Sequence, residues 1–159
     1  MSSFKKQIPE FKKSIDDHLK TILSESDQSS EELSQAMKYS VMNGGKRIRP
    51  MMMLASAITI DIDTEHVMAF ATAIELLHSF SLIHDDLPCM DDDSLRRGQP
   101  TTHVKFGEAT ATLAADSLQS LAFELMAKAE FPESKSSQLE LISMIANSIG
   151  SGGDRKSVV

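Results

Sequence analysis

The feature that most constrains the fold of this chain is the spacing of its apolar residues, which recur at steps of three and four. That spacing places apolar side chains on one face of an α-helix. No alternating stretch long enough for a useful β-strand occurs in the sequence, and no repeat of fixed period is evident. The pattern therefore predicts an all-α fold. In the first expected helix the residues at this spacing are Phe4, Ile8, Phe11, Ile15, Leu19 and Ile22 or Leu23.

Capping and breaking residues indicate where the next helices begin and end. A polar break at 24–30 follows the first helix, and Ser29 or Ser30 is expected to cap the second. The second helix stops at 43–45, where Asn-Gly-Gly favours a left-handed backbone. Its inward-facing residues are expected to be Leu33, Met37 and Val41.

A third helix, over 50–60, is opened by Pro50 and is apolar nearly all round, so it is expected to be buried. A turn at 61–63 follows, and Thr64 is the expected cap of a fourth helix over 65–86.

A polar loop over 91–99 separates the fourth helix from the last two expected helices. The fifth, over 108–129, is rich in Ala and Leu, and its Asp116 is expected to be buried. A break at 131–133 precedes the sixth, over 137–149.

The bulk composition is that of one globular domain, since the chain has 159 residues, of which 41% are hydrophobic and 25% charged. A net charge of −7 argues against a nucleic-acid surface, because phosphate backbones bind to basic surfaces. Small phosphorylated substrates are compatible with this charge, since a local cluster of Lys and Arg is enough to bind them.

The sequence favours a cytoplasmic protein without a membrane partner. Its only cysteine is Cys89, so no intrachain disulfide is expected, as in a reducing compartment. The first twenty residues mix both charges and do not resemble a signal peptide. No segment has the roughly 20 consecutive apolar residues of a typical transmembrane helix.

An acidic cluster follows the fourth expected helix, with five carboxylates within the nine residues 85–93. Like charges this dense repel, and the negative end of the helix dipole adds to the repulsion. Mg²⁺ would compensate, because it binds carboxylate oxygens together with substrate phosphates. Asp85 would lie at the helix end, and Pro88 would turn the chain so that Asp91 returns beside it. The alternative for such an acidic run is a solvated loop.

Basic clusters flank the acidic one on both sides. Arg96 and Arg97 follow it, and Lys46, Arg47 and Arg49 precede it, directly after two glycines. Carboxylates that hold a metal, together with cations that bind the remaining phosphate oxygens, are the composition of a diphosphate–Mg²⁺ site. The glycines allow a close backbone approach, and a helix N-terminus also favours an anion. Taken alone, the upstream cluster could equally be a helix cap with solvated lysines.

These segments resemble the trans-prenyl diphosphate synthase family, and most closely its bacterial farnesyl diphosphate synthase branch. The resemblance runs from about residue 4 to residue 153. It implies a helical isoprenoid-synthase-like bundle that condenses isopentenyl diphosphate with dimethylallyl or geranyl diphosphate to give farnesyl diphosphate. The segments that carry the resemblance are GGKRIRP at 44–50, His78, IHDDLPCMDDDSLRRGQPTTH at 83–103, KFGEA at 105–109 and AADSL at 114–118.

The resemblance also implies residue roles. Asp85 and Asp91 correspond to Mg²⁺ ligands with Asp86 in support, and Arg96 corresponds to a ligand of the allylic diphosphate. The expected catalytic set is therefore Asp85, Asp91 and Arg96. His78 alone would more often be a core histidine, and only the motif match changes this interpretation. The expected pocket for isopentenyl diphosphate is formed by Lys46, Arg49, His78 and Arg97, with Arg96 also counted among the substrate ligands.

The chemistry expected of such a site is ionisation of the allylic diphosphate, followed by attack of the isopentenyl double bond on the cation. Phe80 lies five residues before Asp85, about 7.5 Å along the helix axis. Its ring is expected to act as a floor for the growing chain, and in the family an aromatic here, with the Pro88-Cys89 insertion, goes with a fifteen-carbon product. Phe80 would also be a core residue.

The chain departs from the family pattern after residue 153. The family's second aspartate-rich motif and later lysines are absent, and 154–159 looks unrelated. We therefore expect 1–153 to be the N-terminal part of a single synthase domain that is inactive alone and belongs to a homodimeric parent. Three alternatives stay open: a geranylgeranyl diphosphate synthase, a noncatalytic helical partner subunit, and a generic helical cation-binding module.

Overall fold

The computed structural model of the chain describes residues 2–25, 30–130 and 134–153. Among the described residues, the strands are confined to one short antiparallel hairpin, formed by β1 (Leu95–Arg96) and β2 (Gln99–Pro100). The prediction of an all-α fold is confirmed, while the hairpin and the short helix α5 have no counterpart in the sequence-based expectation. In chain order the elements are α1 (Ser2–Glu25), α2 (Glu31–Met42), α3 (Ile48–Thr59), α4 (Thr64–Asp86), β1 (Leu95–Arg96), β2 (Gln99–Pro100), α5 (Thr102–Phe106), α6 (Glu108–Lys128) and α7 (Lys135–Ile149).

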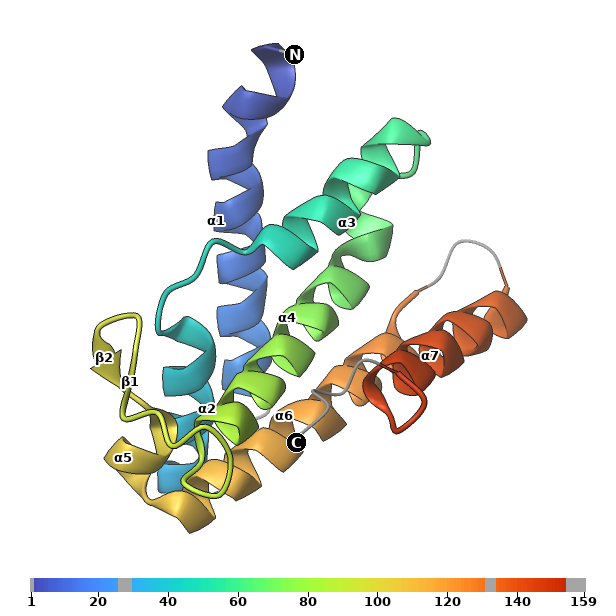
Figure 1. Cartoon of the computed structure of the whole chain (residues 1–159). Coiled ribbons are helices and arrows are strands. Elements are labelled where there is room, and N and C mark those ends of the chain that lie inside the picture. The colour runs from blue at the N-terminus through green and yellow to red at the C-terminus, as the bar shows by residue number, and fades with distance from the viewer. Residues whose placement is uncertain (1, 26–29, 131–133, 154–159) are drawn as a thin grey trace.

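Helix α4 is the central helix of the bundle. It packs along α6 and α3, and it also contacts α1, α2 and α5, whereas α7 packs on α6 (Figure 1). By length and composition α4 is long and apolar enough to cross a membrane, and no other helix among the described residues is. Because 56% of its apolar window is buried inside the structure, α4 has the burial of a core helix. Its largest fully buried side chains include Phe70, Leu76 and Thr72.

Two helix starts illustrate how local sequence sets the boundaries. Ser30 caps α2, as predicted, because its Oγ accepts a hydrogen bond from the backbone N–H of Leu33 at 3.4 Å. The predicted cap of α4 is wrong by one residue, since Asp63 Oδ1 accepts from the N–H of Glu65 at 3.0 Å and Thr64 is already helical. A carboxylate is the better cap here because it also interacts favourably with the helix dipole.

Helix α3 differs from its prediction in start and in burial. It begins at Ile48, so Pro50 lies within the first turn rather than opening the helix. The expectation that α3 is buried all round is wrong, because Ile48 is 52% and Met52 65% exposed. The reason is that α3 packs against α4 and α1, which cover only one of its sides.

Asp116 was expected to be buried in α6, and this is wrong, since its side chain is 60% exposed. The predicted break at 131–133 and the unrelated-looking tail at 154–159 lie outside the described residues.

Candidate active site

The acidic segment folds back on the end of α4. The backbone N–H of Asp91 donates to the carbonyl of Asp85 at 2.9 Å, and the N–H of Asp92 donates to the carbonyl of Leu87 at 3.1 Å. The expectation that a turn at Pro88 returns Asp91 to the side of Asp85 is confirmed. Two carboxylates six positions apart in sequence therefore belong to neighbouring stretches of backbone.

Asp86 has a different environment from the other acids of this segment. It is 3% exposed, whereas Asp91 is exposed. Arg96 Nε lies 2.9 Å from both Asp86 oxygens, and Arg96 Nη2 lies 2.5 Å from Oδ1. This fork-like pairing raises the pKa of Arg96. In the structure, then, Arg96 binds Asp86, and it links the β1–β2 hairpin to the end of α4.

The donor set fits a magnesium ion that arrives with a phosphorylated ligand. Within the described residues no group of three or more His, Cys, Asp or Glu side chains is gathered closely enough to hold a metal ion. Mg²⁺ does not require such a group, since it is typically bound by one or two carboxylates and completes its shell with water and substrate phosphates. Asp85 and Asp91 are of the right chemical type and lie beside each other.

Four of the five predicted substrate ligands, Lys46, Arg49, His78 and Arg97, line one cavity of about 500 Å³, whereas Arg96 lies outside it and pairs with Asp86. Arg49 Nη1 lies 3.3 Å from His78 Nε2, and Arg97 Nη1 donates to the carbonyl of Gly44. Burial and then the nearby Arg49 guanidinium lower the pKa of His78, which favours the neutral imidazole. The cavity is lined by Gly45, Lys46, Arg47, Ile48, Arg49, Glu75, His78 and Arg97.

The two glycines before Lys46 are required by the backbone. Gly44 has φ +79° and Gly45 has φ +137°, conformations that residues with a β-carbon rarely adopt. A β-carbon at position 45 would also lie 3.0 Å from Arg97 Nη1 and 3.4 Å from Arg47 Nη1. The positive φ angles therefore favour glycine at both positions, and at position 45 a side chain would also press on the Arg97 guanidinium.

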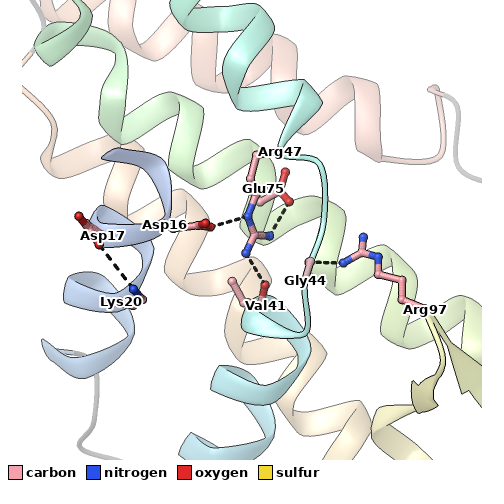
Figure 2. Close-up of polar contacts among 8 residues, drawn as sticks. All are labelled: Asp16, Asp17, Lys20, Val41, Gly44, Arg47, Glu75 and Arg97. Carbon is pink, nitrogen blue, oxygen red and sulfur yellow. Dashed lines mark hydrogen bonds and ion pairs between the residues drawn. The ribbon is translucent and has the colours of Figure 1, made fainter. Parts of the chain in front are cut away.

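A buried ion-pair network lies behind this loop and was not predicted from the sequence. Arg47 is 3% exposed, and its guanidinium donates to Asp16 Oδ1 at 2.8 Å, Glu75 Oε1 at 2.8 Å and the carbonyl of Val41 at 2.9 Å (Figure 2). Glu75, also 3% exposed, is the sequence signal for it, because an acid in the middle of an apolar helix requires a partner. Arg47 has φ +50°, a left-handed conformation that costs roughly 1–2 kcal/mol for a residue with a β-carbon.

An apolar cavity of about 1030 Å³ adjoins the basic one, since Arg49 and His78 line both. Phe80 is 4% exposed, and its ring packs edge-on against His84 with centroids 4.7 Å apart. Phe80 is therefore a core residue and a wall of the cavity at once. Cys89 is exposed and lines the cavity mouth. The other lining residues are Ile74, Leu77, Ser81, Asp85, Leu87, Met90, Thr112, Ile145, Ser148 and Ile149.

Comparison with known proteins identifies the family. The sequence model of the family described as Polyprenyl synthetase matches residues 30–153, which is most of the chain. The chain belongs to this family. The resemblance to trans-prenyl diphosphate synthases that the sequence motifs predict is thereby confirmed.

Relatives within the family are synthases of different product length. The chain is 48% identical over 120 residues to the farnesyl diphosphate synthase of Escherichia coli (strain K12), an alignment that covers 75% of this chain and 40% of that enzyme. It is 46% identical over 121 residues to the chloroplastic geranylgeranyl pyrophosphate synthase of Capsicum annuum, covering 76% of this chain and 33% of that enzyme. The chain thus spans well under half the length of these polyprenyl synthetases.

Solved structures of the family superpose on the described fold. An FPP/GFPP synthase from Zymomonas mobilis, in its apo form, has a TM-score of 0.88 and 38% identity, and the match covers 96% of this chain and 55% of that one. A geranyltransferase from Legionella pneumophila has a TM-score of 0.91 and 33% identity, with 99% and 60% covered. The helical arrangement around the candidate site is therefore that of an isoprenoid synthase.

Proposed function

We propose that this chain is the N-terminal part of a prenyltransferase that condenses isopentenyl diphosphate with dimethylallyl or geranyl diphosphate to give farnesyl diphosphate. The observation that carries the proposal is the pair of adjoining cavities, one basic and one apolar, that share Arg49 and His78. Such a pair suits two substrates that meet, the diphosphate of one bound in the basic cavity and the hydrocarbon tail of the other in the apolar cavity. Asp85 lines the apolar cavity, and in this proposal it lies near the junction between the diphosphate head and the hydrocarbon tail of the allylic substrate.

In this proposal the basic cavity binds the diphosphate of isopentenyl diphosphate. Lys46 and Arg49 are exposed, and with Arg97 they supply donors for charge-assisted hydrogen bonds to phosphate oxygens. Neutral His78 can accept from Arg49 or donate to a phosphate, because its two ring nitrogens have different roles. Arg49, His78 and Arg97 thus already have partners within the chain before the ligand arrives.

The allylic diphosphate is proposed to bind between the acidic loop and the hairpin. Magnesium held there by Asp85 and Asp91 would stabilise the negative charge of the leaving diphosphate. Arg96, fixed by buried Asp86, would contribute a further positive charge beside the same group. The allylic C–O bond breaks, the isopentenyl double bond attacks the resulting cation to form a C–C bond, and the leaving diphosphate accepts the proton that is lost. The apolar cavity excludes water from the cation.

Product length is proposed to depend on Phe80. Its ring closes the cavity wall, which supports a fifteen-carbon product over the twenty carbons of geranylgeranyl diphosphate. The second candidate function is geranylgeranyl diphosphate synthesis, favoured by the 46% identity to the Capsicum annuum enzyme. The third candidate is a partner-subunit role, since the large subunit of a heterodimeric geranylgeranyl pyrophosphate synthase from Arabidopsis thaliana is 50% identical over 97 residues. We propose a homodimer in the cytoplasm for the longer enzyme.

The test is an assay of condensation with radiolabelled isopentenyl diphosphate and geranyl diphosphate, with and without Mg²⁺. The chain extended to the length of its relatives should give a fifteen-carbon alcohol after dephosphorylation, and only with the metal. Residues 1–159 alone should give little or no product and should self-associate, because large apolar side chains such as Met52 are exposed. No product from the extended chain would overturn the enzyme proposal, and a twenty-carbon product would favour the second candidate.

A further inference from the structure

The basic loop between α2 and α3 is held from inside the protein by one side chain. Arg47 lies between Lys46 and Arg49 in the sequence, but its side chain is buried whereas those of Lys46 and Arg49 are exposed. Figure 2 shows the Arg47 guanidinium turned toward Asp16, Glu75 and Val41. Its partners come from three helices: Asp16 from α1, the carbonyl of Val41 from α2, and Glu75 from α4. A single guanidinium therefore joins the loop to α1, α2 and α4.

The conformation of the loop requires such an anchor. Gly44, Gly45 and Arg47 all have positive φ, and a left-handed arginine is held only where its surroundings compensate for the strain. The Arg47 side chain does not cap α3, because a guanidinium has no acceptor for the free N–H groups of the first turn, so it does not serve the helix that it precedes. Its hydrogen bonds instead hold the Arg47 side chain in a buried position, as part of the inner wall of the basic cavity, while Lys46 and Arg49 line the same cavity and are exposed.

Glu75 adds an electrostatic reason for this arrangement. Its carboxylate lines the basic cavity at a place where an anionic ligand is proposed to bind. An unpaired negative charge there would repel a diphosphate, and buried it would be costly. Pairing with Arg47 Nη1 at 2.8 Å removes both problems.

We propose that Arg47 is a positioning residue for the diphosphate site, acting through Glu75, Asp16 and Val41 to place Lys46 and Arg49 rather than by touching the ligand. The identity of the ligand rests on the proposed function, whereas the anchoring of the loop by Arg47 rests on the geometry alone. It assigns a role to Arg47 and Glu75 that is separate from the roles of the exposed cations.

The first test uses binding of isopentenyl diphosphate and of inorganic diphosphate to the chain by calorimetry. Glu75→Leu removes a negative charge next to the cavity. If that charge acts only by repelling the ligand, or if Arg47 contacts the ligand directly, diphosphate binding should become tighter. Positioning predicts the opposite sign: binding about tenfold weaker, because displacement of a binding group by ~1 Å is enough for such a loss. Tighter binding to Glu75→Leu would overturn the proposal.

The second test separates positioning from stability. The double variant Arg47→Met/Glu75→Leu removes both buried charges together, a change that is often neutral for stability. We expect a thermal unfolding midpoint close to that of the wild type but weaker diphosphate binding. Arg47→Lys keeps the positive charge but cannot make the same set of guanidinium hydrogen bonds, so it should weaken binding as well. Unchanged binding in the double variant would overturn the proposal.

The third test needs no ligand. Hydrogen exchange should be faster at the amides of Gly44 and Met51 in the double variant, since these amides bond to Met42 and Arg47 carbonyls within the loop. Lys20→Met is the matched control, because the Lys20–Asp17 pair is an exposed ion pair on α1 and should affect neither the loop nor binding. If the wild type binds neither isopentenyl diphosphate nor inorganic diphosphate, the proposed function fails. Faster exchange in the double variant would still support the anchoring role of Arg47, and unchanged exchange would overturn that role.

Discussion

The basic and acidic halves of the candidate site are built in different ways. The basic half is assembled by the protein alone: Arg47 is buried in a network of hydrogen bonds, and Lys46, Arg49, His78 and Arg97 line one cavity. The acidic half is only partly assembled, since Asp91 lies beside Asp85 in an exposed loop and no closed metal-binding group is formed among the described residues.

The difference follows from the charges that each half can balance internally. Guanidinium groups are stabilised here by carboxylates and carbonyls of the same chain, such as Glu75 and the carbonyls of Gly44 and Val41. Clustered carboxylates repel one another, and the cation that would balance them comes from solution. Asp86 is the exception among these carboxylates, because it is buried and its charge is balanced by Arg96 of the same chain. The comparison predicts that changes in the acidic half affect chemistry, whereas changes behind the basic half affect both structure and binding.

The largest expected effect is on turnover after loss of an acidic ligand. In the chain extended to the length of its relatives, Asp85→Ala or Asp91→Ala should lower kcat about 100-fold or more, because stabilisation of the leaving group is lost in the transition state. The thermal unfolding midpoint should change little or rise, since a like charge is removed. Asp92→Asn is the matched control, as Asn tolerates the left-handed backbone of position 92. Near-normal rates in the alanine variants would refute the metal assignment.

A change in the apolar cavity should affect both product and stability. Phe80→Ala removes a buried ring, which normally costs roughly 3–5 kcal/mol, part of it for the space left behind. An isoprenoid tail can occupy that space, so we expect products of twenty carbons or more at a lower rate. Chromatography of the dephosphorylated alcohols measures this. A variant that remains active and stops at fifteen carbons would restrict Phe80 to a core role.

A smaller effect is expected from the exposed cations of the basic half. Lys46→Met removes one exposed ammonium and should weaken binding of isopentenyl diphosphate about tenfold, the loss of one charge-assisted hydrogen bond. It should leave the unfolding midpoint unchanged, unlike variants of buried Arg47. Calorimetric titration at two salt concentrations checks both the loss and its electrostatic origin, since the difference from wild type should shrink at higher salt. Equal affinity at low salt would remove Lys46 from the site.

The smallest expected effect is on stability as a function of pH. The pKa of His78 is lowered by burial and by Arg49, so the unfolded chain takes up a proton at this residue more readily than the folded chain. Stability should therefore fall as the pH drops below about 6.5, the value for an unperturbed histidine. Urea unfolding at pH 7.5 and pH 5.5 measures the change.

Two variants decide whether His78 causes that pH dependence. His78→Gln should reduce the loss of stability at low pH, whereas His66→Gln, at an exposed position on α4, should not. An identical pH dependence in wild type and His78→Gln would show that the basic half does not disfavour protonation of His78.

Local patterns were enough to predict most helices because caps and apolar spacing act within a few residues. Ser30 and the glycines at 44 and 45 mark the ends of α2 as predicted, and the return of Asp91 to Asp85 follows from the turn at Pro88. The missed elements, β1, β2 and α5, are too short to show a period of their own.

Predictions failed where burial depends on neighbours that are distant in sequence. Helix α3 is apolar nearly all round, yet Met52 is 65% exposed because α4 and α1 cover one side only. Asp116 sits among apolar residues of α6, yet its side chain is 60% exposed. Composition gives the hydrophobicity of a helix but not the number of faces that other helices cover.

The sequence by itself determined the helical class and the family, along with the residue types suited to magnesium and diphosphate. These properties reside in local spacing and in side-chain chemistry, both of which can be read along the chain. Only the tertiary structure decided that Arg47 is buried while Lys46 and Arg49 are exposed, and that Arg96 pairs with Asp86. The physical reason is that a buried charge depends on partners from several helices, and such partners meet only when the chain has folded.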